Sequence, residues 1–264
     1  MVLAGTLLLA GCTSGDGSPV PGSPGVSVVP SSVSGAPSVP SSAAPSSSRP
    51  QRVVVLDPGH NGGNASHPGV INKPVPAGRG ETKPCNTTGT ATRTGYPEHA
   101  FTWDVAQRVG ALLRAGGLRV EYTRNDDNGV GPCVDRRAAI GNEANADAVV
   151  SIHADGSTSP GAHGFHVSYS APPLNPAQGE PSISLAHALR DSLQRAGYPT
   201  STYLGSAGIY PRDDLAGLNL STRPAALVEC GNMRNATEAA AMASPEGRAR
   251  YAQAIASAIE AFLG

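Results

Sequence analysis

The chain has 264 residues, of which 39% are hydrophobic and 15% charged, and its formal net charge at pH 7 is −1. This length and apolar content are sufficient for one substantial buried core. The near-neutral charge and the lack of a basic block in the sequence argue against a nucleic-acid-binding protein.

The first 12 residues form an apolar run that is too short to span a bilayer and ends in Leu9-Ala10-Gly11-Cys12. We interpret residues 1–12 as a segment that resembles a bacterial lipoprotein signal, in which Cys12 is lipidated. The segment departs from that pattern because no Lys or Arg precedes the apolar run, and a chance apolar N-terminus is the alternative. The lipoprotein interpretation predicts an exported protein of the cell envelope, anchored to the outer face of the cytoplasmic membrane only through a lipid on Cys12.

Residues 13–50 consist almost entirely of Ser, Pro, Gly, Val and Ala. Such a composition buries too little apolar surface to offset the entropy of ordering the chain, so it predicts a disordered linker. As a flexible coil, the linker would reach roughly 35 Å and would suit a tethered enzyme. An inert tail fits the composition equally well.

The first strand of the folded region is predicted at residues 53–56, where four apolar residues precede Asp57-Pro58-Gly59-His60. His60 therefore stands at the carboxyl end of a buried strand, where ligands collect in open α/β sheets. The next segment, residues 61–96, is unusually long for a loop in a compact domain, and we expect it to have a function.

Helices and strands are predicted to alternate along the rest of the chain. The first helix begins at Pro97, places Glu98 and Phe101 on one face, and ends at Gly116-Gly117. Further strands are expected at residues 118–123, 148–152, 164–169 and 224–228, and further helices at 134–144, 185–196 and from Pro245 onward. This alternation predicts an α/β fold with a single open, mostly parallel or mixed sheet flanked by helices on both faces.

The cysteines outside the N-terminal segment contain no CxxC pair. Cys85 lies in the long loop and Cys133 directly precedes a predicted helix, so we expect a disulfide between them in an oxidising compartment. Cys230 belongs to an apolar strand, and we expect it to be a buried free thiol.

Three ionisable residues, His60, His153 and Glu229, stand at the ends of predicted buried strands, and Glu98 opens the first helix on its apolar face. Each has an ordinary structural interpretation, but together two imidazoles and a carboxylate are the usual donors of a hydrolytic zinc site. A further carboxylate would act as the general base. Spacing leaves open which Glu has which role. His99 competes with Glu98 as a donor, but it lies about 100° around the helix, so we prefer Glu98.

Four ordered motifs closely resemble the zinc-dependent N-acetylmuramoyl-L-alanine amidases of bacterial cell-wall hydrolysis. They are Asp57-Pro58-Gly59-His60, Pro97-Glu98-His99-Ala100, Ser151-Ile152-His153-Ala154-Asp155 and Leu227-Val228-Glu229-Cys230-Gly231-Asn232. The resemblance covers the folded region and implies a catalytic domain over residues 51–264. It also implies that His60, Glu98 and His153 bind Zn²⁺ and that Glu229 is catalytic. The loop with its predicted disulfide is similar to that of mycobacterial-type members.

The resemblance implies hydrolysis of the amide bond between N-acetylmuramic acid and the L-alanine of the stem peptide. Peptidoglycan or a muramyl peptide would be the substrate, and we expect a monomer. Two alternatives remain open, namely a zinc peptidase that cleaves within the stem peptide and a non-catalytic lipoprotein that binds peptidoglycan.

Overall fold

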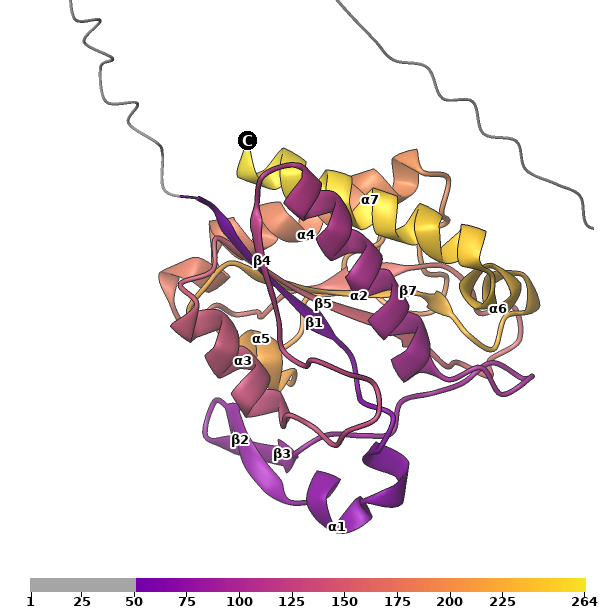
Figure 1. The fold of residues 1–264 in the computed structure, drawn as a ribbon, viewed down its shortest axis with the longest axis horizontal. Coiled ribbons are helices and arrows are strands. Elements are labelled where there is room, and N and C mark those ends of the chain that lie inside the picture. Colours follow the sequence, from indigo (N-terminus) through magenta and orange to yellow (C-terminus); the bar gives the residue numbers. More distant parts are fainter. Residues whose placement is uncertain (1–50) are drawn as a thin grey trace, which may run out of the picture. The chain divides into compact units, whose positions relative to one another are not determined.

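The computed structural model of the protein describes residues 51–264 (Figure 1). The predicted signal segment 1–12 and linker 13–50 lie outside the described residues. Within 51–264, none of the helices combines the length and the apolar character needed to cross a membrane.

The centre of the fold is a five-stranded sheet with the order β4-β1-β5-β7-β6. Its four parallel strands are β1 (Val53–Pro58), β4 (Arg119–Tyr122), β5 (Ala148–Asp155) and β7 (Ala225–Asn232). The edge strand β6 (His166–Ser168) pairs antiparallel with β7. The predicted open, mostly parallel mixed sheet is confirmed.

Helices cover both faces of the sheet (Figure 1). One face packs on α2 (Glu98–Ala115), α4 (Glu180–Arg195) and α7 (Pro245–Leu263), and it forms the larger core. The opposite face packs on α3 (Val134–Glu143) and the short α5 (Ala216–Asn219). Strand residues alternate between these layers, because successive side chains of a strand point to opposite faces. In β7, Val228 faces the larger core and Ala225 the smaller one.

Several element ends differ from the prediction. Pro97 is not the first helical residue but the N-cap of α2, with an extended backbone at φ −83° and ψ 151°. His153 and Glu229 lie inside β5 and β7 rather than after them, because parallel pairing of these strands continues past both residues. Helix α6 (Ala236–Ala243) was not predicted, since its Ala-rich sequence has little amphipathic pattern.

Residues 61–96, predicted as one long loop, contain short elements of their own. These are η1 (Asn64–Ser66), α1 (Pro68–Ile71) and a hairpin of β2 (Pro74–Gly78) and β3 (Glu81–Pro84). The remaining short elements of the fold include η2 (Pro176–Gln178). The loop was not recognised as a hairpin because its strands contain Pro, Lys and Glu instead of alternating apolar residues.

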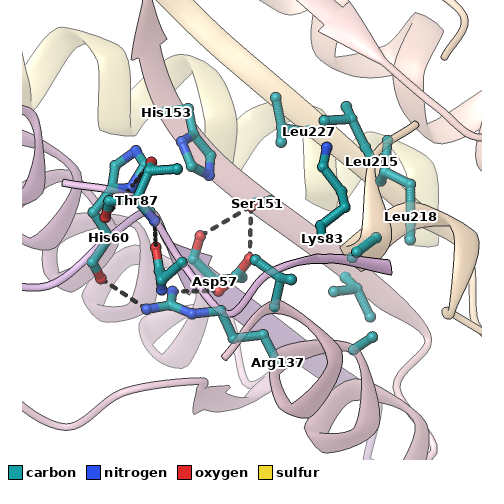
Figure 2. Close-up of a pocket in the computed structure, with 18 of the residues that line it drawn as sticks. Asp57, His60, Lys83, Thr87, Arg137, Ser151, His153, Leu215, Leu218 and Leu227 are labelled. Atoms are coloured by element: carbon teal, nitrogen blue, oxygen red, sulfur yellow. Dashed lines mark hydrogen bonds and ion pairs between the residues drawn. The ribbon is translucent and has the colours of Figure 1, made fainter. Parts of the chain in front are cut away.

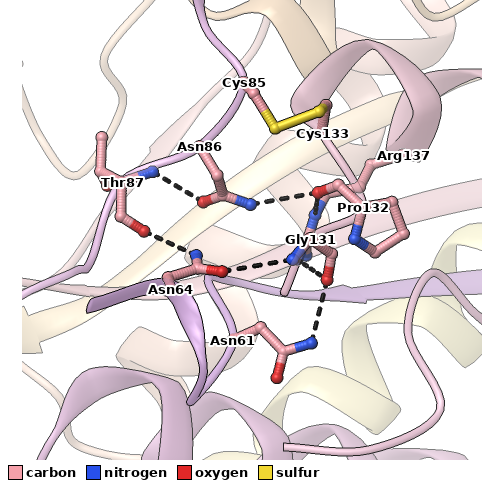
Figure 3. Close-up of a disulfide and its surroundings, with 9 residues drawn as sticks. All are labelled: Asn61, Asn64, Cys85, Asn86, Thr87, Gly131, Pro132, Cys133 and Arg137. Carbon is pink, nitrogen blue, oxygen red and sulfur yellow. Dashed lines mark hydrogen bonds between the residues drawn. A yellow bond between two sulfur atoms is a disulfide. The ribbon is translucent and has the colours of Figure 1, made fainter. Parts of the chain in front are cut away.

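The predicted disulfide between Cys85 and Cys133 is present, with an S–S distance of 2.08 Å, and Cys230 is a buried free thiol as expected. Asparagine amides connect the same two segments (Figure 3). Asn61 Nδ2 donates to the Gly131 carbonyl at 2.9 Å, and Asn86 Nδ2 donates to the Pro132 carbonyl at 3.1 Å. The disulfide and these amides hold the long segment against the start of α3.

Candidate metal centre

The candidate site lies at the point where successive strand connections change from one side of β1 to the other. From β1 the chain continues through α2 to β4 on one side, and through α3 it returns to β5 on the other side. A crevice at such a point is the usual ligand site of an open α/β sheet. His60 follows β1, Glu98 opens α2 and His153 lies near the end of β5, and their donor atoms all lie within 4.8 Å of one another.

Glu98 is at the centre of this cluster and is only 3% exposed. Its Oε1 accepts the Ala154 N–H at 3.1 Å and lies 3.0 Å from Nδ1 of His153. Its Oε2 accepts the Thr90 N–H at 2.9 Å and lies 3.2 Å from Nε2 of His60. Burial acts to raise the pKa of Glu98, but the two imidazoles outweigh it and hold that pKa below its ordinary value. The carboxylate is therefore ionised and fixed between the two rings.

His60 has a left-handed backbone with φ +58°, which is unfavourable for a residue with a side chain by about 1 kcal/mol. Its Nδ1 donates to the Thr87 carbonyl at 3.1 Å, which leaves Nε2 directed toward Glu98. Gly89 packs against both side chains, and a Cβ there would lie 2.6 Å from the His60 ring. Burial lowers the pKa of His60, but the Glu98 carboxylate reverses this effect and raises it.

Two buried arginines hold the turn after β1 in place. Arg137 Nη1 donates to the Pro58 carbonyl at 2.7 Å, and its Nη2 donates to the His60 carbonyl at 2.7 Å. Arg124 Nε donates to the same Pro58 carbonyl at 3.0 Å, and its Nη2 reaches the first turn of α2 at 2.9 Å. The sequence analysis missed both arginines. Arg124 directly follows the strand predicted at residues 118–123. This position at the carboxyl end of a strand could have identified it as a candidate site residue.

His153 and His99 have different surroundings. Gly59 allows the His153 ring to approach the chain, because a Cβ at Gly59 would lie 2.3 Å from that ring. His99, the competing donor in the sequence analysis, instead pairs with Asp127 at 2.8 Å. The structure thus brings Glu98, not His99, into the cluster with the other two side chains.

Glu229 stands directly beside the cluster, because β7 pairs with β5 so that Glu229 is opposite His153. Its Oε2 is buried and has no hydrogen-bond partner within residues 51–264. Burial and the negative charges of Glu98 and Asp155 raise the pKa of Glu229 well above its ordinary value. A carboxyl group with a raised pKa is suited to exchange protons near neutral pH.

A cavity of about 170 Å³ opens from the cluster along the face of the sheet toward α3 and α5. His60 and His153 lie at one end, and Leu215, Leu218 and Leu227 line the other (Figure 2). On its wall, Asp57 accepts hydrogen bonds from Arg137 Nη1 at 2.8 Å and from Ser151 Oγ at 2.6 Å, whereas most of the remainder is apolar. The cavity provides space for an extended substrate next to the donor atoms of His60, Glu98 and His153.

The donor set fits zinc chemistry. Two imidazoles and one carboxylate, converging from three elements, match the ligands of hydrolytic zinc sites. The carboxyl group of Glu229 lies outside this donor set and beside it, which is the position required of a general base. All four residues predicted from the sequence are thus assembled at one place.

Comparison with known proteins agrees with this geometry. Residues 54–261 match the family model described as N-acetylmuramoyl-L-alanine amidase. An N-acetylmuramoyl-L-alanine amidase of Mycobacterium tuberculosis is 50% identical over 211 residues, which cover 80% of this chain and 86% of that protein.

Two crystal structures of the N-acetylmuramyl-L-alanine amidase Ami1 also match. That of Mycobacterium abscessus, an apo form, has 57% identity and a TM-score of 0.78 and covers 81% of this chain and 99% of its own. That of Mycobacterium smegmatis has 54% identity and the same TM-score of 0.78, with 81% and 97% covered. The chain therefore belongs to the N-acetylmuramoyl-L-alanine amidase family.

Proposed function

We propose that this amidase is zinc-dependent and hydrolyses the amide bond between N-acetylmuramic acid and the L-alanine of the peptidoglycan stem peptide. His60, Glu98 and His153 would hold the metal, and Glu229 would be the catalytic carboxylate. The observation that carries the proposal is the convergence of these three donors within 4.8 Å, beside a carboxylate with an unpartnered buried oxygen. Family membership supports the choice of the bond.

A zinc ion in this cluster would polarise the scissile carbonyl and lower the pKa of water. Glu229 would take a proton from the attacking water and deliver it to the departing amine of L-alanine, which leaves poorly without it. The backbone N–H groups of Thr90 and Ala154 hold Glu98 in position during turnover. The Thr87 carbonyl performs the same task for His60 by accepting a hydrogen bond from its Nδ1.

The experiment measures zinc content and release of stem peptide from a muramyl peptide by the wild type and by single variants. Glu229→Gln is expected to reduce kcat by about 10²- to 10⁴-fold with zinc retained, because only proton transfer is lost. His60→Ala and His153→Ala are expected to lose both zinc and activity. His187→Ala, at an exposed position of α4, serves as the matched control and is expected to retain both.

Four outcomes contradict the proposal. Full activity of Glu229→Gln would remove Glu229 from the mechanism, and zinc-independent turnover would remove the metal. Product masses provide the third outcome: truncated peptides in place of a stem peptide with intact L-alanine would make the enzyme a peptidase. Binding of peptidoglycan without release of any peptide would instead favour the non-catalytic interpretation.

We further propose that the protein is exported and anchored through a lipid on Cys12. The disulfide between Cys85 and Cys133 supports export, because such bonds persist mainly in oxidising compartments. Metabolic labelling with a fatty-acid probe is expected to mark the wild type and not Cys12→Ser. Equal labelling of both proteins, or of neither, would contradict lipidation at Cys12.

A further inference from the structure

The edge strand β6 places a second histidine directly beside Glu229. In the antiparallel pair of β6 and β7, His166 lies opposite Glu229, and in the parallel pair of β5 and β7, His153 lies opposite the same residue. Side chains at directly opposite positions of neighbouring strands point to the same face of a sheet. His153, Glu229 and His166 therefore form one row across three strands, with Glu229 in the middle.

Two adjacent members of this row carry buried polar atoms that lack a partner. His166 is 2% exposed, and its Nδ1 has no hydrogen bond in the part of the chain that the structure describes. The same holds for Oε2 of Glu229. An unsatisfied buried polar atom weakens folding, so two at neighbouring positions call for a functional explanation. Nδ1 of a neutral imidazole can carry a proton and donate it in a hydrogen bond, whereas Oε2 of an ionised carboxylate only accepts. The two atoms are therefore complementary.

The surroundings keep His166 in one place and in one charge state. Its ring packs edge-on against Tyr210 at a centroid distance of 5.6 Å. Burial lowers the pKa of His166 to about 4, with Arg212 acting in the same direction and Asp155 opposing it. The imidazole is therefore neutral near pH 7 and offers one N–H and one lone pair. Arg212 donates two hydrogen bonds of 2.7 Å to Asp214, and its positive charge acts to lower the pKa of Glu229.

We propose that His166 is a positioning residue for Glu229, and that one bridging water accepts a hydrogen bond from His166 Nδ1 and donates one to Oε2 of Glu229. This bridge would fix the rotation of the carboxylate and leave Oε1 to take the proton of the attacking water. The inference deepens the proposed function and rests on it for its kinetic consequence. The bridge itself does not depend on turnover.

The kinetic test compares His166→Phe with His166→Asn in the full chain loaded with zinc, using a muramyl peptide as substrate. Phe keeps a ring against Tyr210 but removes both nitrogens, and kcat is expected to fall about 10- to 100-fold with KM within twofold, as for other groups that orient a reacting side chain. Asn places an amide N–H near the Nδ1 position and is expected to restore most of this loss. Zinc content and Tm are expected to stay at the wild-type values in both variants.

Ser168→Ala is the matched control. Ser168 is the next residue of β6 on the same face, is 1% exposed and also has an unpartnered side-chain oxygen, but it lies opposite Leu227. Its kcat is expected to equal that of the wild type. The proposal is overturned if His166→Phe keeps kcat within twofold, if KM alone changes, or if the Phe and Asn variants are equally impaired and both lose Tm.

A second measurement separates this inference from the proposed function. In ¹⁵N-histidine NMR at pH 7, the His166 signals, assigned through their loss in His166→Phe, are expected to show a proton on Nδ1. They are expected to shift in Glu229→Ala and to remain unchanged in Ser168→Ala. An unprotonated Nδ1, or signals that do not respond to Glu229→Ala, would overturn the hydrogen bond even if the enzyme is an active amidase. A protonated, responsive Nδ1 in an inactive protein would contradict only the proposed function.

Discussion

Asp57 shows that a carboxylate next to the candidate metal site can have a purely structural task. It precedes His60 by three residues, yet both of its oxygens are used inside the fold. Oδ1 accepts Thr123 Oγ1 at 2.6 Å and Arg137 Nη1 at 2.8 Å, and Oδ2 accepts Ser151 Oγ at 2.6 Å. Burial acts to raise the pKa of Asp57, but the Arg137 charge and these bonds lower it to about 2. The residue therefore supports the turn that carries His60.

This arrangement predicts a pH-dependent contribution to stability. The pKa of Asp57 falls from its ordinary value of 3.8 to about 2 on folding, so its contribution is complete above about pH 4 and lost as the pH falls through 2. Asp57→Asn is expected to reduce the unfolding free energy at pH 7 by about 3 kcal/mol, because it leaves Arg137 buried and unpaired. That difference is expected to shrink by up to about 2 kcal/mol between pH 5 and pH 2.

Urea unfolding of the wild type and Asp57→Asn across this pH range provides the measurement. The comparison with the wild type isolates Asp57, because all other carboxylates titrate equally in both proteins. A difference that stays constant between pH 5 and pH 2 would contradict the role of ionised Asp57.

At the scale of elements, the segment at residues 61–96 is attached to the rest of the domain at several points, including its hairpin, where Arg79 donates to Ser170 and Lys83 donates to the Asp214 carbonyl. Its hairpin of β2 and β3 forms a separate two-stranded sheet. The attachment is covalent at the disulfide between Cys85 and Cys133 and polar at Asn61, Asn64 and Asn86, whose side chains bond to the 131–132 turn. Thr87, whose carbonyl accepts a hydrogen bond from His60 Nδ1, lies two residues after Cys85. The disulfide thus supports the metal cluster from outside it.

Removal of the disulfide is expected to weaken the fold and the site together. The two cysteines are 48 residues apart in sequence, and chain entropy alone then gives a loss of about 4 kcal/mol in unfolding free energy for Cys85→Ala/Cys133→Ala. Zinc affinity is expected to fall about tenfold, because the disulfide no longer holds the segment that carries Thr87 in place. Denaturant unfolding and zinc titration measure the two effects.

Reductant treatment is the control for this prediction. It is expected to reproduce the loss of stability in the wild type and to leave the double variant unchanged, since Cys230 is the remaining buried cysteine of the domain. A double variant as stable as the oxidised wild type would show that the polar contacts alone hold the segment.

At the scale of the whole molecule, the candidate metal site joins parts of the chain that are far apart in sequence. His60, Glu98 and His153 come from β1, α2 and β5, so a metal that binds all three side chains binds only the folded chain. Binding to the native state alone stabilises it by mass action. The thermal stability of the domain therefore reports on the metal site independently of activity.

Zinc at about 100 times its Kd is expected to add about 2.7 kcal/mol to the stability and to raise Tm by roughly 5–10 °C over the chelated protein. Glu229→Gln is expected to show the same increase because it keeps all three donors. His60→Ala/His153→Ala is expected to show none. Differential scanning calorimetry with and without zinc measures these Tm values. Equal Tm values for the wild type in both conditions would contradict metal binding by these residues.

Elements with a strong local period, and the functional residues at their ends, could be predicted from the amino-acid sequence. Apolar runs predicted β1, β5 and β7, helical spacing predicted α2, α4 and α7, and the motifs singled out His60, Glu98, His153 and Glu229. These features are local, because a strand or an amphipathic helix is encoded in its own residues. The disulfide could also be predicted, since few cysteines were available.

The contacts among these groups depend on the folded chain. Helical spacing already favoured Glu98 over His99, and the packing of α2 against β5 brings it to the two histidines. The contacts of Arg124 and Arg137 depend on the turn after β1, which the sequence did not reveal. The position of His166 beside Glu229 depends on the register of an antiparallel edge strand. Register and helix packing are set by the burial of apolar surface across the whole domain, so no segment contains that information alone.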